Sequence, residues 1–262
     1  LTTKPSMPAK WKTRFQLKPG SWVFVPTKAT VSSGLEIKQA IEKGWKPPRY
    51  YFHLKDGGHV RALQSHIHHT SFLHLDIRDF FGSINRTRVT RCLKSLFGYC
   101  DARAMANEST IFHPDEKGRR TILPFGFVQS PIVASMCLYQ SALGRCLHRL
   151  NQLKDVQVSV YVDDIVVSTD SHELTTEALG QLTEASKKAG FALNTEKQEG
   201  PADSITAFNI DLSHLALVIE PERFARFLEA YKGSGSEFQR NGILGYLNSV
   251  NANQANQVAL VS

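Results

Sequence analysis

The sequence predicts an α+β fold, a prediction that depends on two strand-like stretches and two amphipathic helices. Residues 156–168 alternate in polarity over their first half, so that alternate valines lie on one face, as in a β-strand. Residues 72–77 form a second apolar stretch around a single Asp. Residues 87–108 and 173–189 instead repeat apolar side chains at the spacing of one helix face. We therefore expect strands that carry acidic residues and pack against helices.

Composition restricts the class of protein. The 262 residues are 42% hydrophobic and 21% charged, which describes a folded chain that forms one globular unit with subdomains. No apolar run reaches the length of a membrane span, and no secretory leader pattern is present, so no membrane partner is expected. Cys92, Cys100, Cys137 and Cys146 lack Cys-x-x-Cys spacing. Buried, reduced thiols and a cytoplasmic location are therefore expected.

The positive charge is concentrated in the N-terminal quarter of the chain. Residues 1–70 hold 12 Lys and Arg against 3 Asp and Glu, whereas the remainder holds 19 against 21. Such a surface suits a nucleic acid, although a merely solvated face explains modest basicity as well. Nucleic acid is favoured because aromatic residues alternate with these cations, even though some of the rings can belong to the core: Trp11, Phe15, Trp22, Phe24, Trp45, Tyr50, Tyr51 and Phe52.

The first elements are expected to be short. An extended basic arm within residues 1–30 precedes a strand at 22–25, and a helix follows at 35–43. Residues 50–54 and 60–63 flank Lys-Asp-Gly-Gly-His, which predicts a β-hairpin with glycine in the turn.

The later elements alternate between helices and hairpins. After a loop at 112–121, the small residues of 132–150 predict one long, closely packed helix. Residues 205–210 and 215–219 predict a hairpin, and 221–250 predict helices broken at Gly233 and Gly235. The Asn- and Gln-rich residues 251–257 are expected to mark the end of the ordered domain.

Three acidic residues indicate the chemistry. Asp163 and Asp164 interrupt the strand pattern and are expected at the tip of a hairpin. Alone, this pair is better explained as a surface turn. Asp76, inside an apolar strand, changes that balance, because a buried carboxylate needs a partner. If the two stretches are neighbours, the three carboxylates converge and can hold two divalent ions about 3.5–4 Å apart, as in phosphoryl transfer.

Three motifs carry a resemblance to reverse transcriptases. Tyr161-Val-Asp-Asp164 is similar to their Tyr-x-Asp-Asp signature. Residues 76–84 (Asp-Ile-Arg-Asp-Phe-Phe-Gly-Ser-Ile) resemble the first catalytic motif of bacterial members, including retron and group II intron enzymes. Residues 123–131 resemble the Leu-Pro-x-Gly-x-x-x-Ser-Pro motif. The resemblance covers roughly residues 50–250 and looks closest to small, stand-alone enzymes associated with phage defence.

The resemblance implies an α+β right-hand polymerase fold with reduced fingers, a ferredoxin-like palm and a small helical thumb. It assigns residues 1–70 to a basic region and fingers, 71–220 to the palm with a fingers insertion around 100–130, and 221–262 to the thumb. Residues 242–251 resemble the thumb helix of retron-type enzymes.

The resemblance also implies RNA-directed DNA synthesis by a two-metal mechanism. Asp76, Asp163 and Asp164 would be catalytic and, with Ile77, would bind two Mg²⁺ ions, with Mn²⁺ as a substitute. The expected partners are an RNA template, in particular a non-coding RNA, deoxynucleoside triphosphates, and a DNA product or RNA–DNA hybrid. Protein partners or self-association are compatible with the sequence, and a role in antiviral defence follows from the likeness alone.

Further site residues are implied position by position. Those expected at the nucleotide are Lys55, Arg61, Asp79, Phe80, Phe81, Gln129 and Lys197; those expected at the primer or template are Tyr161, Gly126 and Ser130. Phe81 matches a ring that excludes the 2′-hydroxyl, and Lys197 matches a lysine that protonates pyrophosphate. Each has a structural alternative: a core ring for Phe80 and Phe81, an exposed cation for Lys55 and Lys197. Phe125 stands where many relatives have Gln, so Gln129 is a substitute contact.

Other interpretations stay open at this point. An RNA-binding scaffold with a silent polymerase site is disfavoured by the intact set of three Asp residues. An RNA-dependent RNA polymerase is disfavoured by Phe81 and Tyr161. Four clustered histidines lack a second ligand pair for zinc and are expected to be structural or RNA-contacting: His66, His68, His69 and His74.

Overall fold

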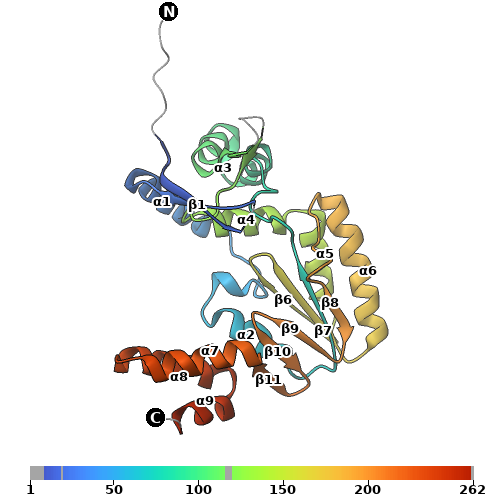
Figure 1. The fold of residues 1–262 in the computed structure, drawn as a ribbon. Helices are drawn as coiled ribbons and strands as arrows, with labels where there is room; N and C mark the ends of the chain where they lie inside the picture. Colours follow the sequence, from blue (N-terminus) through green and yellow to red (C-terminus); the bar gives the residue numbers. More distant parts are fainter. Residues whose placement is uncertain (1–8, 19, 116–119, 261–262) are drawn as a thin grey trace, which may run out of the picture. The chain divides into compact units, whose positions relative to one another are not determined.

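The computed structural model describes residues 9–18, 20–115 and 120–260 (Figure 1). The chain forms two compact units, each built from segments that are distant in sequence. The first unit consists of Leu1–Pro48, Ile77–Arg145 and Ser186–Ala192, and the second of Arg49–Asp76, Cys146–Ala185 and Leu193–Ser262. Both units contain helices and strands, as an α+β fold requires. The predicted division of the chain at residues 70 and 220 stays a prediction.

A four-stranded antiparallel sheet forms the centre of the second unit. Its strands are, in order across the sheet, β6 (Val156–Tyr161), β7 (Asp164–Thr169), β3 (Ser71–Asp76) and β8 (Glu199–Ala202). All six residues of β3 are buried, because strands lie on both sides of it and its side chains are mostly apolar. The two predicted strands and the turn between β6 and β7 are therefore confirmed.

A smaller sheet and three helices also belong to the second unit. The sheet contains β9 (Ser204–Ala207), β10 (Ile210–Ser213) and β11 (Ala216–Ile219), and the helices are α7 (Pro221–Gly233), α8 (Glu237–Val250) and α9 (Ala252–Ala259). One hydrophobic cluster joins them, with Ile205, Ile210, Leu212, Leu217, Tyr231, Leu247 and Val258 among its members. The predicted helix break between residues 233 and 235 is confirmed.

The expected end of the domain at residues 251–257 is wrong, because this segment forms α9. Asn251 caps the helix by accepting a hydrogen bond from the backbone N–H of Gln254 at 3.1 Å. The Gln254 amide bonds both backbone groups of Ile219 at the end of β11. Polar side chains here satisfy backbone groups of a packed element, and Ala255 and Val258 supply its buried side.

The hairpin predicted for residues 50–63 is also wrong. Phe52–Leu54 form a 3₁₀ turn, η1, and Gly58–Gln64 form the helix α2. Gly57 has a φ of 92°, and this left-handed residue precedes the helix instead of closing a two-residue hairpin turn. Val60 and Leu63 are both buried, and their spacing of three places them on one helix face.

The first unit begins with a two-stranded antiparallel ribbon. The strand β1 (Trp11–Lys18) pairs with β2 (Ser21–Pro26), so the expected basic arm is a strand over its described part. The helix α1 (Lys28–Gly44) starts earlier than predicted, because Thr27 caps it by accepting from the backbone N–H of Thr30 at 3.2 Å.

The remaining elements of this unit surround the predicted loop. The helix α3 (Arg86–Ser109) is confirmed and bends at Gly98, which has a φ of 74°. The strands β4 (Ile111–Phe112) and β5 (Thr121–Ile122) pair across the predicted loop. The predicted helix 132–150 is instead two helices, α4 (Ser130–Tyr139) and α5 (Ala142–Leu150). Ser141 caps the second by accepting from the backbone N–H of Gly144 at 3.1 Å.

The helix α6 (His172–Ala189) and the cysteines also follow the sequence. The buried residues Ala178, Leu182 and Ala185 lie on one face of α6, which confirms its predicted amphipathic character. Cys92, Cys137 and Cys146 are buried as expected, whereas Cys100 on α3 is exposed. No helix in the described part of the chain is both long and apolar enough to cross a membrane.

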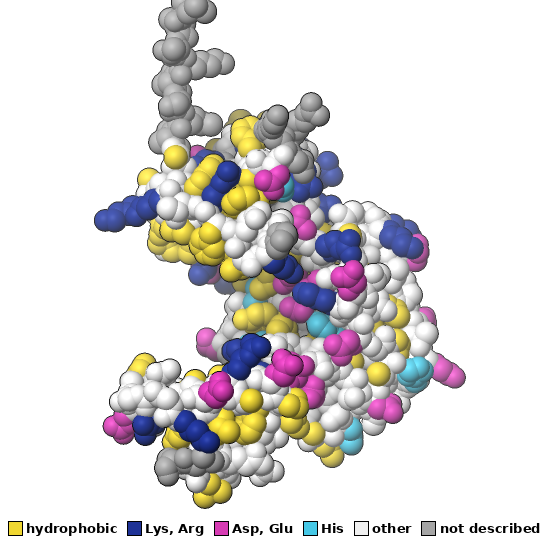
Figure 2. Space-filling model, viewed as in Figure 1, with side chains coloured by type: hydrophobic (Ala, Val, Ile, Leu, Met, Phe, Trp, Pro, Cys, Tyr) yellow, Lys and Arg dark blue, Asp and Glu magenta, His cyan; other side chains and the backbone are white. Residues whose placement is uncertain are grey.

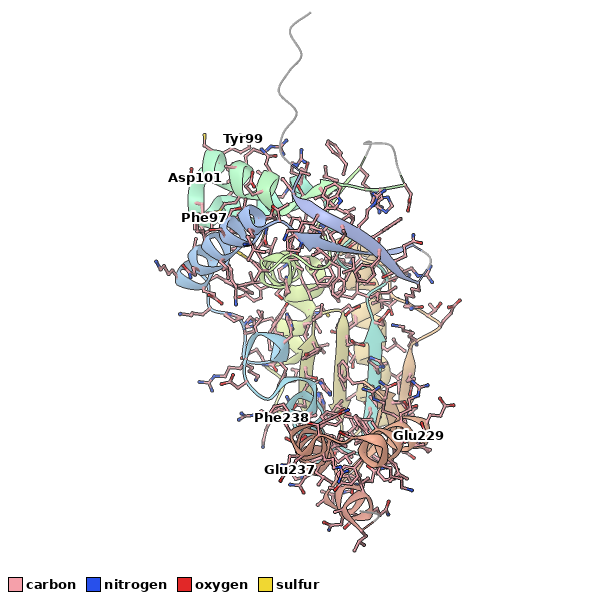
Figure 3. The ribbon with its side chains drawn as sticks, turned by 60° about the vertical axis from the view of Figure 1, so that its left-hand side comes forward. Phe97, Tyr99, Asp101, Glu229, Glu237 and Phe238 are labelled. Carbon is pink, nitrogen blue, oxygen red and sulfur yellow. The ribbon has the colours of Figure 1, made fainter. Side chains whose placement is uncertain are left out.

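On the face shown in Figure 2, Lys and Arg side chains are interspersed with Asp and Glu, so this face carries charges of both signs. The basic ribbon contributes Lys12, Arg14 and Lys18, all exposed, with the Arg14 guanidinium 4.7 Å from the ring centre of Trp22. Exposed rings also occur: Figure 3 marks Phe238 near the start of α8, which is 90% exposed.

Gly126 is held in place by β2. The backbone N–H of Phe24 donates to the carbonyl of Phe125 at 2.9 Å, which brings the two segments into contact. Gly126 has a φ of 110°, and a Cβ atom on it would lie 2.3 Å from the carbonyl oxygen of Phe24. Glycine is thus required for the packing of the first unit, apart from the contact with template that the motif suggests.

We expect Gly126→Ala to lower the free energy of unfolding by about 1–3 kcal/mol, because the new methyl meets rigid backbone at an unfavourable φ. The matched control is Gly180→Ala in α6, where no atom lies within 4 Å and alanine should be neutral or stabilising by up to about 1 kcal/mol. Urea unfolding followed by circular dichroism measures both. Equal changes in the two variants would contradict the packing argument.

Candidate functional site

Two acidic residues face each other across neighbouring strands. The register pairs Asp76, the last residue of β3, with Asp164, the first residue of β7. Asp163 lies in the turn between β6 and β7, next to Val162, whose φ of 61° is unfavourable for a β-branched side chain. We call Asp76, Asp163 and Asp164 the acidic cluster. The predicted convergence of the two motifs is confirmed by this strand pairing.

The turn is supported by the segment before α2. The backbone N–H of Val162 donates to Nδ1 of His53 at 2.9 Å, and the backbone N–H of Val160 donates to the carbonyl of Tyr50 at 2.8 Å. Burial lowers the pKa of His53 to about 4, so its ring stays neutral at physiological pH and Nδ1 remains an acceptor. A strained turn persists where its surroundings fix it, and strain of this kind concentrates at functional sites.

Asp76 is buried and satisfied by two side chains. Its Oδ2 lies 2.7 Å from Nζ of Lys197, and its Oδ1 accepts from the side-chain amide of Asn194 at 3.2 Å. The backbone N–H of Asn194 also donates to the carbonyl of Asp76 at 2.8 Å. The hydrogen bond to Asp76 raises the pKa of Lys197, against the opposing effect of burial, so this lysine is a cation. Lys197 therefore lies beside one member of the acidic cluster, and the role predicted for it at the pyrophosphate stays a prediction.

Asp164 is held from β3 as well. Nε2 of His74 lies 2.8 Å from Oδ1 of Asp164, and the His74 side chain is only 8% exposed. His74 stands two residues before Asp76 on the same strand, so the two side chains point to the same face of the sheet.

The carboxyl group of Asp163 has a raised pKa. Burial, followed by the nearby charges of Asp164 and Asp76, raises its pKa to about 6. Lys197 lowers this pKa, but as the last and smallest influence. The charged form of Asp163 is therefore disfavoured, chiefly by burial and next by the charge of Asp164.

The donor chemistry of the cluster fits a hard divalent cation. Carboxylate oxygens are the ligands that Mg²⁺ and Mn²⁺ prefer. Within the described residues, no group of three or more His, Cys, Asp or Glu side chains is arranged to enclose a metal ion. Lys197 and His74 instead engage two of the three carboxylates. Binding a cation at Asp76 therefore requires the half-exposed Lys197 to turn away from Oδ2 of that carboxylate.

A group of rings adjoins the acidic cluster within the second unit. The Tyr161 ring is 5.3 Å from that of Phe208, which occupies the turn between β9 and β10, and 5.9 Å from that of His59 on α2. His59 Nε2 is 3.2 Å from the hydroxyl of Tyr246 on α8. Tyr161, predicted to lie at the primer, is thus packed against the rings of His59 and Phe208, and Tyr246 supports His59 in turn.

Lys55 and Arg61 do not lie on a hairpin, because α2 replaces it. Lys55 Nζ donates to the carbonyl of Arg49 and lies 3.5 Å from the ring centre of Phe52. Arg61 is exposed on α2. Burial lowers the pKa of Lys55, with smaller contributions from Arg61 and Arg49. The contacts predicted between these cations and a triphosphate stay predictions.

The other predicted nucleotide residues belong to the first unit. Phe80 is buried, and its ring packs against Phe81 and Phe191 at 5.6 and 5.7 Å. Phe81 is only partly buried and packs on Phe125 at 5.6 Å. Asp79 has a φ of 45° and lies 3.7 Å from a guanidinium nitrogen of Arg120.

Gln129 and Ser130 are both buried in the first unit. Gln129 packs so closely on α1 that a Cβ on Gly34 would lie 2.4 Å from its Oε1. Ser130 Oγ donates to the carbonyl of Pro124 at 2.6 Å. Ser130 thus supports the fold, whereas Oε1 of Gln129 is buried without a hydrogen-bond partner. The nucleotide and template contacts predicted for both side chains stay predictions.

Sequence reasoning missed three polar residues of the second unit. His74 was grouped with other histidines, although its spacing of two from Asp76 already placed it on the same strand face. Asn194 stands three residues before Lys197, and its role depends on a loop that no periodicity reveals. His59 was assigned to a hairpin turn and lies instead on α2.

The sequence matches a family model described as reverse transcriptase (RNA-dependent DNA polymerase) over residues 24–207, which is well over half of the chain. No curated protein matches the chain in sequence.

Solved structures give further matches. Telomerase from Candida albicans in complex with a TWJ fragment of telomeric RNA matches with a TM-score of 0.54 and 11% identity, over 87% of this chain and 47% of that one. Foamy viral protease-reverse transcriptase matches with TM-scores of 0.47 in complex with RNA/DNA hybrid and 0.49 with double-stranded DNA. The match to the complex with RNA/DNA hybrid has 17% identity and covers 74% of this chain and 23% of that one. The match to the complex with double-stranded DNA has 16% identity and covers 90% of this chain and 34% of that one.

The chain thus spans less than half the length of each of these proteins. The family match, together with the likeness to telomerase, confirms the predicted fold class, the α+β fold of a reduced right-hand polymerase.

We expect Asp163→Asn to stabilise the protein in a metal-free buffer at pH 8 by about 1–3 kcal/mol, because it removes a carboxylate whose pKa is raised on folding. The gain should shrink as the pH falls from about 6 toward 4, where the wild-type carboxylate takes up a proton. Thermal unfolding across this pH range measures the effect. Asp170→Asn, at the exposed end of β7, is the control and should change little. No gain at pH 8 would contradict the charge crowding.

Proposed function

The chain belongs to the reverse transcriptase family, and we propose that it is an RNA-directed DNA polymerase that extends a primer on an RNA template. The observation that carries the proposal is the pairing of Asp76 with Asp164 beside Asp163, within the segment that matches the family. The proposed reaction joins the 3′-hydroxyl oxygen of the primer to the α-phosphorus of a deoxynucleoside triphosphate and releases pyrophosphate.

We propose that Asp76, Asp163 and Asp164, with the backbone carbonyl of Ile77, would hold two divalent cations, Mg²⁺ or Mn²⁺. When bound, such ions neutralise phosphate charge and favour loss of the primer hydroxyl proton. The raised pKa of Asp163 supports this assignment, because a bound cation would favour the charged form that burial, and next the charge of Asp164, disfavours.

Lys197 would supply a proton to the departing pyrophosphate. Its Nζ is a protonated donor beside Asp76, and its half-exposed side chain is free to turn toward a phosphate once another cation serves that carboxylate. Tyr161, braced by Phe208 and His59, would contact the primer terminus.

The first unit would contribute nucleotide selection. The partly buried Phe81 would exclude a 2′-hydroxyl, with buried Phe80 supporting it from below. Asp79, Gln129, Ser130 and Gly126 would shape the nucleotide and template contacts, and Lys55 and Arg61 would meet the triphosphate.

We further propose that the template is a non-coding RNA and that the enzyme acts in the cytoplasm, in defence against phage. The resemblance of its motifs to stand-alone bacterial enzymes supports this assignment. The exposed cations of β1, with Arg14 stacked on Trp22, support RNA binding, since stacked guanidinium groups and phosphate-binding cations are common in such surfaces. Protein partners or self-association would be compatible with the exposed rings.

Replacing both Asp163 and Asp164 by Asn should abolish deoxynucleotide incorporation, because the carboxylates that hold the cations are lost. We expect a decrease of at least about 10³-fold, with the circular dichroism spectrum unchanged. Primer extension on an RNA template measures the effect, and Asp170→Asn provides the control. Incorporation by the double variant near the wild-type rate would refute the assignment.

Phe81→Ala should admit ribonucleotides, because the space for a 2′-hydroxyl is opened. We expect the ratio of kcat/KM for deoxynucleotides to that for ribonucleotides to fall by about 10-fold or more, corresponding to roughly 1.4 kcal/mol. Single-nucleotide incorporation measures the ratio. Phe112→Ala, which also removes an exposed ring of the first unit, should leave the ratio unchanged. Unaltered discrimination in Phe81→Ala removes Phe81 from this role.

A further inference from the structure

His74 differs from the other groups that contact the acidic cluster. Its side chain is 8% exposed and it lies inside β3, the strand that ends at Asp76. Its Nε2 is 2.8 Å from Oδ1 of Asp164 on the neighbouring strand. The other ring nitrogen, Nδ1, is buried and has no hydrogen-bond partner. Burying a ring nitrogen without a hydrogen-bond partner costs free energy. A histidine at this position therefore calls for an explanation, and its one hydrogen bond, to Asp164, is where we look for it.

The contact with Asp164 fixes the ring chemically. An ionised carboxylate only accepts hydrogen bonds, so Nε2 of His74 must carry the hydrogen. The ring is enclosed by the sheet, with the Phe208 ring centre 6.5 Å away. His74 therefore offers one N–H, in a fixed direction, to one oxygen of Asp164.

Lys197 and His74 make similar contacts but respond differently to an incoming cation. The Lys197 side chain is 52% exposed and flexible, so a divalent ion can displace it from Asp76 into solvent. The His74 side chain is only 8% exposed and belongs to a strand whose residues are all buried, so it has no comparable path into solvent. Its hydrogen bond engages Oδ1 of Asp164 and leaves Oδ2 available to an ion.

We propose that His74 is a positioning residue that holds Oδ1 of Asp164 and so presents Oδ2 to a divalent cation. This inference rests on the proposed function, because it assumes that Asp164 is a ligand. A donor behind a carboxylate ligand fixes its rotamer and lowers the entropy lost when the ion binds. Asp164 would then bind the ion through Oδ2 alone. His74 itself would contact neither the ion nor the substrate.

Replacing His74 by Gln, Asn or Leu tests the proposal. The Gln amide nitrogen can reach the position of Nε2, whereas the shorter Asn cannot and Leu has no donor. Mn²⁺ affinity is measured by electron paramagnetic resonance of the free ion, on purified protein without nucleic acid or nucleotide. We expect His74→Asn and His74→Leu to bind Mn²⁺ about 10-fold or more weakly, and His74→Gln to stay within about threefold of wild type.

Thermal unfolding without metal checks that each variant is folded, and the comparison of Gln with Asn remains valid if Leu fails to fold. His68→Leu, at an exposed histidine, is the control and should bind as wild type does. Wild-type affinity in all three His74 variants overturns the positioning role. If wild-type protein binds Mn²⁺ no better than the Asp163→Asn, Asp164→Asn double variant does, the metal site of the proposed function is wrong and this inference fails with it.

Discussion

The pairing of β3 with β7 is the constraint on which the rest of the site depends. Their register sets Asp76 directly opposite Asp164, although 87 residues separate them in the chain. Like charges opposite each other destabilise a sheet, and buried carboxylates are costly without partners. The fold keeps this arrangement because apolar residues fill the rest of both strands and because Lys197, Asn194 and His74 each bind one of the two carboxylates.

The contacts of the acidic cluster described above all lie within the second unit. The turn that bears Asp163 is stabilised by His53, the end of β3 by the loop that carries Asn194, and Tyr161 by the rings of His59 and Phe208. The site is thus supported by backbone and ring contacts around it, and the cationic side chains adjust to its charge. Under the proposed function, this division would let the carboxylates stay in place while the half-exposed Lys197 turns toward a phosphate.

The sequence predicted the strands of the site well because their signal is local. Alternating valines and an apolar run define β6, β7 and β3, and the acidic residues interrupt these patterns where the strands end. The register between β3 and β7 is a long-range property, and only the three motifs together indicated it. His74 could not be assigned a role, since its partner Asp164 lies on another strand and a histidine in an apolar strand has many explanations.

The errors have physical causes too. Gly57 and Gly58 were taken for a hairpin turn, but the left-handed Gly57 leads into α2, where Val60 and Leu63 pack at helical spacing. Asn251 and Gln254 look like a disordered tail in composition, yet they cap α9 and bond the edge of β11. The strand β1 was not predicted, because nearly all of its residues are exposed. An exposed strand does not need the alternation of apolar and polar residues by which strands are identified in a sequence.

The central claim, that carboxylates from two distant parts of the chain share bound cations, is tested most directly by iron-mediated cleavage. Fe²⁺ in place of Mg²⁺, with ascorbate and peroxide, produces hydroxyl radicals that cut the backbone close to the bound ion. The account predicts cuts in two places in the same molecule population, near residue 76 and near residues 163–164, both suppressed by excess Mg²⁺. Cleavage at only one of these places, or cleavage that Mg²⁺ does not suppress, would contradict it.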